Sequence, residues 1–569
     1  MIQIIPVRTW RITGLYQFAL AILVLFIVFF VVAPLIAILY RAVVDVGGGN
    51  FVLTGRHLST VLSDSIYWTA LLNTVVISLG ASFVATAIGT VFAWIFVRTD
   101  TIGRDFFEAV SQLPIFIPPF VGAVAWMLLA APRSGIINRL LAPPGSPGAL
   151  DVYSHIGILF VIGLYLAPYV MMIVAASLRG MDPSLEEAAQ VSGLNRTQTA
   201  WRITAPLVAP AILSGAALAF TIAIGLFGTP VVLGWSRQIL MLTSRIWISS
   251  QETPPNYGVM AVLAIYLMLL SILATWVQER ALKGRRHTTI SGKGFRPRLI
   301  ELGRWRWLTC ALALLYIVST ILAPISVLIA AALSRFTWSG DFAIGNFVEA
   351  ISTDDVWSTL QISIYLSVVS ASIATGIGVL ISWIVVRTQL RWRRILEYLI
   401  LLPISIPGIA FGVGVMLVWI SSPAPVYGTA LIIIFAFVGR FTAYAVRSTS
   451  ASLVQVHPEL EESARIAGYG PLQTFAKITL PLILPSIVAA WLLLFSFFMT
   501  ELSMVVILYT AANRTFSVLS FEAWNVGDFS KLASYSLLQL AVGMIFMALL
   551  KLLMGRMDGR SVKAPPTPT

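Results

Sequence analysis

Cysteine and histidine are scarce in this chain of 569 residues. The single cysteine, Cys310, excludes a disulfide framework and a thiolate metal site. The histidines are scattered and show no ligand spacing; they are His57, His155, His287 and His457. The sequence therefore predicts neither a bound metal nor any other cofactor.

Motifs for nucleotide binding and catalysis are also missing. No G-x4-G-K-[ST] loop is present, because Gly292-Lys293 is followed by Gly294 and lies in no strand-to-helix context. The dinucleotide-binding glycine fingerprint and a plausible catalytic triad are absent as well. The chain is therefore predicted not to be an enzyme in itself.

Charged residues make up only 11% of the chain, whereas hydrophobic residues make up 58% and the mean hydropathy is +0.90. A soluble domain cannot bury that much apolar surface. The first apolar run is longer than a signal-peptide core and lacks a small-residue cleavage site, so we read it as a retained helix. Twelve candidate spans follow the chain, near 15–40, 69–97, 107–131, 156–178, 205–231, 257–278, 307–333, 358–386, 395–420, 427–446, 482–510 and 532–554.

The net charge of +13 is distributed unevenly over the loops between these spans. With a cytoplasmic N-terminus, the cytoplasmic segments hold 27 Lys and Arg and the external segments hold 9. Such a bias fixes membrane topology. We therefore predict that both termini are cytoplasmic, and we read the basic charge as a topology signal rather than as a nucleic-acid site.

The chain is a tandem duplication. ATAIGTVFAWIFVRT at 85–99 matches ATGIGVLISWIVVRT at 374–388, and LPIFIPP at 113–119 matches LPISIPG at 402–408, both at an offset of 289 residues. These matches predict two six-helix units of the same orientation, 1–290 and 291–569. The basic stretch 279–306 between them is a solvated cytoplasmic linker or, alternatively, a site for phospholipid or nucleic acid.

Two polar loops repeat a second pattern, at an offset of 275 residues. The loops are MDPSLEEAAQVSGLNRTQTAWRITAPLVAP at 181–210 and VHPELEESARIAGYGPLQTFAKITLPLILP at 456–485. Polar loops normally vary more than buried helices. The shared spacing therefore indicates that something outside the membrane recognises both loops. The offset falls from 289 residues in the first pattern to 275 in the second, so the first half holds 14 extra residues. We place them within the Pro/Gly-rich stretch 131–155.

The residues of the first loop predict an elbow. Asp182 can cap a helix that begins at Pro183, and acids in its first turn suit the helix dipole. Gly193 can adopt the left-handed conformation that ends this helix. A second short helix is expected at 196–203, before Pro206 begins the next span.

Each elbow is expected to present small residues that another protein can approach closely. In the first loop these are Ala188 and Ala189. The alternative is an ordinary amphipathic loop that packs on its own helix bundle.

The paired loops resemble the E-A-A-x3-G-x9-I-x-L-P signature of inner-membrane permeases of binding-protein-dependent ABC importers. The chain carries EAA-x3-G-x9-ITAP at 187–206 and ESA-x3-G-x9-ITLP at 462–481, with Ala205 and Ser463 as departures. The resemblance implies an all-α protein of the bacterial cytoplasmic (inner) membrane, with twelve transmembrane helices in two tandem type I importer permease units. It also implies these ATPase-coupling residues: Glu187, Ala188, Ala189, Gly193, Glu462, Ala464 and Gly468.

The same resemblance implies partners. Each elbow would be a coupling helix in a groove of an ATP-binding cassette subunit, present in two copies. ATP hydrolysis would occur in that separate subunit. A periplasmic or lipid-anchored binding protein would deliver the substrate.

Prolines and one acid are the candidates for the transport pathway. Proline bends a spanning helix, so the prolines are either hinges and pathway lining or static packing kinks. Glu501 is the one acid predicted well inside a span, and it either faces a cavity, which we favour, or pairs with Arg440. The candidate prolines are Pro114, Pro118, Pro403 and Pro407.

Substrate identity is less firmly indicated. ELSMVVILYTAANRTFSVLSFEAWNVGDF at 501–529 resembles fused ferric-iron importer permeases, and GLFGTPVVLG at 225–234 is similar both to those and to polyamine-type permeases. Ferric iron is the expected substrate. The alternatives are polyamine, thiamine or phosphonate import, or an ion-coupled secondary transporter.

Overall fold

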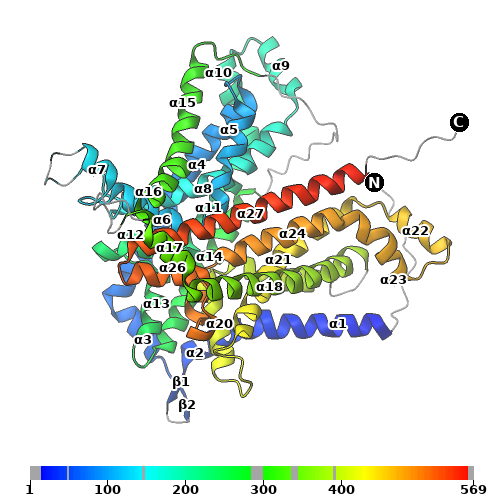
Figure 1. The fold of residues 1–569 in the computed structure, drawn as a ribbon. Helices are drawn as coiled ribbons and strands as arrows, with labels where there is room; N and C mark the ends of the chain where they lie inside the picture. The colour runs from blue at the N-terminus through cyan, green and yellow to red at the C-terminus, as the bar shows by residue number, and fades with distance from the viewer. Residues whose placement is uncertain are drawn as a thin grey trace. The chain divides into compact units, whose positions relative to one another are not determined.

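The computed structural model describes residues 14–47, 50–141, 143, 146, 148–282, 299–334, 344–388 and 393–561. Among them, ten helices are long and apolar enough to cross a membrane. Two further pairs of helices reach that length only across a sharp bend. The twelve predicted spans thus correspond to ten helices and two bent pairs (Figure 1).

The described helices group into two compact units, which differ from the two sequence repeats. Unit 2 takes its residues from 54–352 and 520–537. Its elements are α3 (Arg56–Ser63), α4 (Ser65–Arg98), α5 (Arg104–Ser111), η2 (Leu113–Phe116), α6 (Pro119–Ala130), α7 (Ile136–Leu141), α8 (His155–Arg179), α9 (Pro183–Val191), α10 (Arg196–Thr199), η3 (Ala200–Thr204), α11 (Ala205–Gly225), α12 (Gly228–Gly234), η4 (Trp235–Arg237), α13 (Leu242–Gln251), α14 (Tyr257–Leu282), α15 (Trp305–Ile317), η5 (Val318–Leu322), α16 (Ala323–Ala332) and α17 (Gly345–Ser352).

Unit 1 takes its residues from 1–53, 353–519 and 538–569. Its elements are α1 (Gly14–Ile27), η1 (Val28–Val32), α2 (Ala33–Val43), the antiparallel strands β1 (Val44–Gly47) and β2 (Asn50–Leu53), α18 (Asp354–Arg387), α19 (Arg393–Leu401), η6 (Leu402–Ser405), α20 (Gly408–Ile420), α21 (Ala430–Gln455), α22 (Pro458–Ile466), α23 (Pro471–Thr474), η7 (Phe475–Thr479), α24 (Leu480–Thr500), α25 (Val505–Leu508) and η8 (Ala511–Asn513). The chain passes between the units within α26 (Phe516–Asn525) and α27 (Phe529–Ser561).

The first span of each repeat packs in the unit that holds most of the other repeat. Unit 1 contains the first span of the first repeat, and unit 2 contains the first span of the second repeat. In unit 1, α2 lies against α20 so closely that a Cβ on Gly414 would be 2.6 Å from the Pro34 carbonyl oxygen. In unit 2, Tyr316 of α15 donates a 3.2 Å hydrogen bond to the Leu164 carbonyl of α8. The predicted sequence boundary at 290/291 and most of the basic linker lie outside the described residues, so the division into 1–290 and 291–569 stays a prediction.

The two bent pairs hold the candidate prolines. The third span is interrupted between η2 and α6 by a bend of 101°, and the ninth between η6 and α20 by 111°. Pro114 and Pro403 lie in the 3-10 turns, whereas Pro118 and Pro407 immediately precede the helices that follow. All four are buried. Each of these spans is therefore two helices, since proline removes a backbone donor and clashes with the preceding turn.

Several predicted span boundaries are wrong. The tenth span ends at Gln455 rather than at 446. The fifth span runs from Ala200 to Gly225 and the eleventh from Leu472 to Thr500. Both therefore start earlier and end earlier than predicted. The hydrophobic residues that follow belong to the short helices α12 and α25, which a hydropathy pattern cannot separate from the span.

Candidate functional site

The first elbow forms as its capping residues predict, whereas the helix of the second elbow, α22, follows His457 without a side-chain cap. In unit 2, Asp182 accepts a 2.9 Å hydrogen bond from the Ser184 backbone N–H, and α9 begins at Pro183. Gly193 ends the helix at a φ of +88°, and Gly468 has the same φ after α22. A side chain would be strained at this φ, which explains why glycine stands at both positions. In Figure 1, α9 and α10 lie at one end of the long helices of their unit.

The second arm of each elbow is not a separate helix. The sequence predicts a short helix at 196–203, but α10 runs directly into the π-helical segment η3 and then into α11. In unit 1, α23, η7 and α24 follow one another in the same way. π-helical turns are rare and frequently lie at functional sites. Their equivalent positions in the two repeats indicate a conserved geometry within the chain.

The elbow helices divide their predicted coupling residues between two faces. Glu187, Ala188 and Glu462 are exposed. Ala189 is only 7% exposed and Ala464 only 6%, because they face the helices of their own unit. The prediction that Ala188 and Ala189 together face a partner is therefore wrong for Ala189, and Ala464 is likewise turned away.

Exposed apolar side chains, which the sequence reading missed, occupy equivalent positions on the two elbows. Val191 is 90% exposed and Ile466 is 88% exposed, each at the C-terminal end of its elbow helix. Leu185 and Leu460, one and a half turns earlier, are about half exposed. The offset of 275 residues relates both pairs, so the internal alignment could have found them. An exposed apolar side chain therefore stands at the same place on both elbows.

Each elbow also has an inward-facing carboxylate, one residue before the predicted coupling glutamate; the Glu186 side chain is 19% exposed and the Glu461 side chain is 8% exposed. Glu186 lies 3.1 Å from Nη1 of Arg98 and accepts a 2.6 Å hydrogen bond from Thr204. Its counterpart, Glu461, accepts hydrogen bonds of 3.0 Å from an arginine and 2.8 Å from a threonine. We call each group a carboxylate junction; the unit 2 junction is Arg98, Glu186 and Thr204, and the unit 1 junction is Arg387, Glu461 and Thr479.

In unit 2, residues 300–302, which lead into the second repeat, lie beside the carboxylate junction. The Ile300 N–H donates a 2.8 Å hydrogen bond to the Arg98 carbonyl, and the Asp100 N–H donates one of 3.2 Å to the Ile300 carbonyl. Asp100 also accepts a 2.8 Å bond from the Leu302 N–H. A pocket opens here, with Arg98, Glu186 and Ile300 in its wall.

Glu501 does not lie inside a helix. It caps the end of α24, where one carboxylate oxygen accepts a 3.0 Å hydrogen bond from the Met504 N–H. The other oxygen lies 3.9 Å from Nη1 of Arg440, and both side chains are about 15% exposed. Arg440 also donates a 3.3 Å hydrogen bond from Nε to the Ile406 carbonyl, at the bend before α20. The pairing with Arg440, which the sequence analysis gives as the alternative to a cavity-facing position, is present because α24 ends early.

The first repeat has no such ion pair at the equivalent positions. Offset by 275 residues, Tyr165 corresponds to Arg440 and Leu226 to Glu501. Tyr165 is buried, and Leu226 follows α11 as Glu501 follows α24. The repeats therefore share the helix ends but differ in charge at this site.

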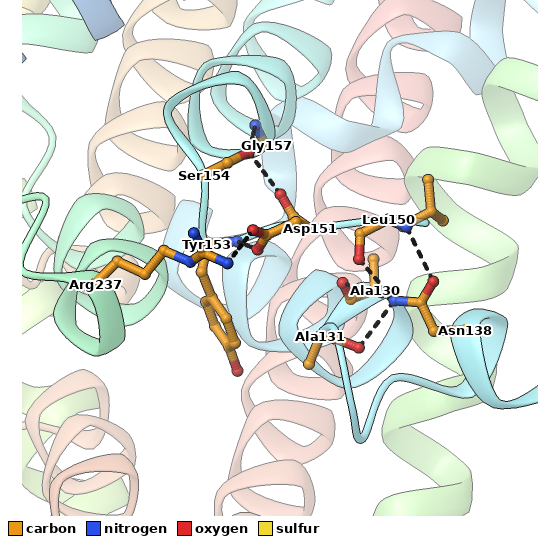
Figure 2. Close-up of polar contacts among 9 residues, drawn as sticks. All are labelled: Ala130, Ala131, Asn138, Leu150, Asp151, Tyr153, Ser154, Gly157 and Arg237. Carbon is orange, nitrogen blue, oxygen red and sulfur yellow. Dashed lines mark hydrogen bonds and ion pairs between the residues drawn. The ribbon is translucent and has the colours of Figure 1, made fainter. Parts of the chain in front are cut away.

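In the described part of the extra loop of the first repeat, Asn138 and Asp151 make several polar contacts (Figure 2). Asn138 is 3% exposed, and its amide donates to the carbonyls of Ala131 and Leu150 at 3.0 and 2.7 Å. It also accepts a 3.0 Å bond from the Leu150 N–H. Asp151 forms a 2.6 Å ion pair with Arg237. The Asn138 contacts thus join Ala131 to Leu150, and the ion pair joins Asp151 to the neighbouring loop.

Tyr153 lies beside this ion pair, and its N–H donates a 3.0 Å hydrogen bond to Asp151. Burial raises the pKa of the Tyr153 phenol, and the Asp151 carboxylate raises it further.

Comparison with known proteins agrees with the duplicated elbows. Residues 85–287 and 374–561 each match the family described as the binding-protein-dependent transport system inner membrane component. The chain belongs to this family. It is a multi-pass transport permease of an ABC importer in the inner membrane, made of two tandem permease units, and it works with a binding protein.

Relatives of this permease extend over most of the chain. The ferric transport system permease protein FbpB of Actinobacillus pleuropneumoniae is 27% identical, over 92% of this chain and 76% of that protein. The Fe(3+)-transport system permease protein FbpB 2 of Haemophilus influenzae is 26% identical, over 84% of this chain and 88% of that protein. A chain of a bacterial alginate ABC transporter is 18% identical, with a TM-score of 0.38 over 46% of this chain and 97% of that chain.

Proposed function

We propose that this permease imports ferric iron delivered by an external binding protein, and that two ATP-binding subunits drive it by docking on the elbows. The duplicated elbow is the observation that carries the proposal. Both elbow helices begin with proline, end before a glycine of the same conformation and carry an exposed apolar side chain at the same place. Because the elbow surface occurs twice in the chain, it can bind two copies of the same partner.

The substrate assignment is supported by the relatives. Both proteins named above are ferric transport permeases, and they match this chain along most of its length. A ferric ion is a hard cation that prefers oxygen ligands. The Glu501 carboxylate, partly exposed at the broken end of α24, is of the chemical type that such a cation would meet along a pathway.

The docking surface has a defined composition. Val191 and Ile466 would insert into an apolar groove of the ATP-binding subunit, while Glu187 and Glu462 would face its polar rim. The elbows would then lie on the cytoplasmic side, with both termini on the same side, as the distribution of Lys and Arg predicts. ATP hydrolysis would take place in the partner, and this chain would supply only the moving pathway.

Co-purification tests the docking. An ATP-binding subunit should purify with the wild-type chain, and Val191→Asp together with Ile466→Asp should remove it, because a buried unpaired carboxylate is costly. A matched control is Leu53→Asp, at a leucine of β2 that is 81% exposed. This control should keep the partner.

Two outcomes would overturn the proposal. The first is a wild-type chain that purifies without an ATP-binding subunit yet transports. The second is undiminished binding of that subunit by the double Asp variant. The substrate is tested separately, by comparing uptake of radiolabelled ferric iron with that of labelled polyamine, thiamine and phosphonate.

A further inference from the structure

Each carboxylate junction joins three segments that are far apart in sequence. In unit 2, Glu186 links the elbow helix α9 to the end of α4 and to the start of the fifth span. Arg98 is only 2% exposed, so its charge is almost fully removed from water. A buried charge that loses its partner is strongly disfavoured. The elbow helix therefore cannot move away from these spans without a large penalty.

The junction in unit 1 is held by more hydrogen bonds. Arg387 donates from Nη2 to the carbonyls of Leu453 and Val456, at 3.0 and 2.8 Å, in addition to its bond to Glu461. These carbonyls belong to the end of α21 and the residues just before the elbow. The side chains of Arg387 and Glu461 are 12% and 8% exposed. The junction thus ties the elbow to three spans of its unit, to α18 and α21 through Arg387 and to the eleventh span through Thr479.

The threonines of both junctions stand at the last residue of a π-helical segment, Thr204 in η3 and Thr479 in η7. A π-helical turn holds one more residue than an α-helical turn and changes the direction of the side chains that follow it. In both units this turn coincides with a hydroxyl that donates to the elbow carboxylate. The repetition of the whole arrangement indicates a required contact rather than incidental packing.

We propose that Glu186 and Glu461 are positioning residues that make each elbow helix move as one body with the spans behind it. The inference rests on the proposed function, because it concerns how a displacement of the elbow by an ATP-binding subunit reaches the pathway. The adjacent carboxylates have different tasks. Glu187 and Glu462 face outward toward the partner, and Glu186 and Glu461 face inward toward the spans.

A distance measurement within unit 1 tests this directly. Spin labels are placed at Glu459→Cys, which is exposed on α22, and at Leu493→Cys on α24, with Cys310→Ser to remove the native thiol. The second label lies about 20 Å along the helix from the start of α24, by the rise per residue. Double electron–electron resonance is recorded on the chain purified with its ATP-binding subunit, with and without ATP plus vanadate.

The chain with an intact junction should give one narrow distance that does not change with nucleotide. Glu461→Gln should give a broader distribution that shifts when ATP and vanadate are added. Glu462→Gln, the matched change at the neighbouring exposed carboxylate, should keep the narrow distance. A Glu461→Gln variant with an unchanged distribution, or an intact junction whose distance shifts equally, would overturn the inference.

Transport gives a second readout. Glu461→Gln should retain the ATP-binding subunit and its ATP hydrolysis but move about tenfold less radiolabelled ferric iron per ATP, since a charge-assisted hydrogen bond is lost. An unchanged ratio, or loss of the subunit itself, would contradict a positioning role. If no ATP-binding subunit joins the wild-type chain, the proposed function fails, and the distances in the chain alone still decide whether Glu461 fixes the elbow.

Discussion

The contact between α18 and α21 gives a sharp prediction about stability. Gly378 lies where a Cβ would be 2.5 Å from the Cβ of Ala445 and 3.2 Å from the Val446 backbone nitrogen. Gly376, two residues earlier on the same helix, has no atom within 4 Å of such a Cβ. We expect Gly378→Ala to destabilise unit 1 and Gly376→Ala to stabilise it.

The magnitudes follow from these distances. Two carbon atoms in contact lie about 3.5–4.0 Å apart, so the helices must separate locally by about 1 Å to admit the new methyl group. Overpacking of this kind costs about 1–3 kcal/mol. Replacing glycine by alanine within a helix contributes about 1 kcal/mol of stabilisation at both positions. This gain cancels in the comparison, so the two variants should differ in unfolding free energy by about 1–3 kcal/mol.

The assay is unfolding of the purified chain in mixed micelles, followed by tryptophan fluorescence as denaturing detergent is added. Gly378→Ala should unfold at a lower detergent fraction than the wild-type chain, and Gly376→Ala at a higher one. Equal midpoints for the two variants would refute the close approach of α18 and α21 at Gly378.

Three further predictions concern the pathway and the extra loop of the first repeat. Glu501→Gln should lower ferric-iron uptake while the ATP-binding subunit still co-purifies, and unchanged uptake would remove this residue from the pathway. Asn138→Leu should speed limited proteolysis within 131–155, because several hydrogen bonds of Asn138, worth about 1 kcal/mol each, are lost. A cleavage rate equal to that of the wild-type chain would show that other contacts hold the loop. Asp151→Asn should lower the pKa of the Tyr153 phenol, since a neighbouring negative charge is removed, and NMR of ring-labelled tyrosine would contradict this if that pKa stayed the same or rose.

Local signals predicted the elbows well. Asp182 and Gly193 act within a few residues of their own positions, so the cap and the helix end could be predicted directly from the sequence. Apolar length likewise predicted the number of spans. Proline predicted where two of them are interrupted, but not bends of 101° and 111°, which depend on packing around the break.

The sequence did not predict the long-range contacts of the carboxylate junctions. Arg98 and Glu186 are 88 residues apart, and no local pattern indicates that they meet. The signal was nevertheless present, because the duplication places an arginine and a glutamate at equivalent positions in both repeats. The hydropathy pattern predicts Glu501 inside a helix because the apolar residues after it continue the hydrophobic run, whereas α24 ends at Thr500.

Energy-dependent uptake of ferric iron tests the central claim most directly. Cells that lack their own ferric importer are supplied with this chain, an ATP-binding subunit and a binding protein, and accumulation of radiolabelled ferric iron is measured. We predict accumulation that requires all three proteins, stops when ATP is depleted and is lost when Val191 and Ile466 are both changed to Asp. Uptake by this chain alone, driven by an ion gradient in cells without ATP, would contradict the account.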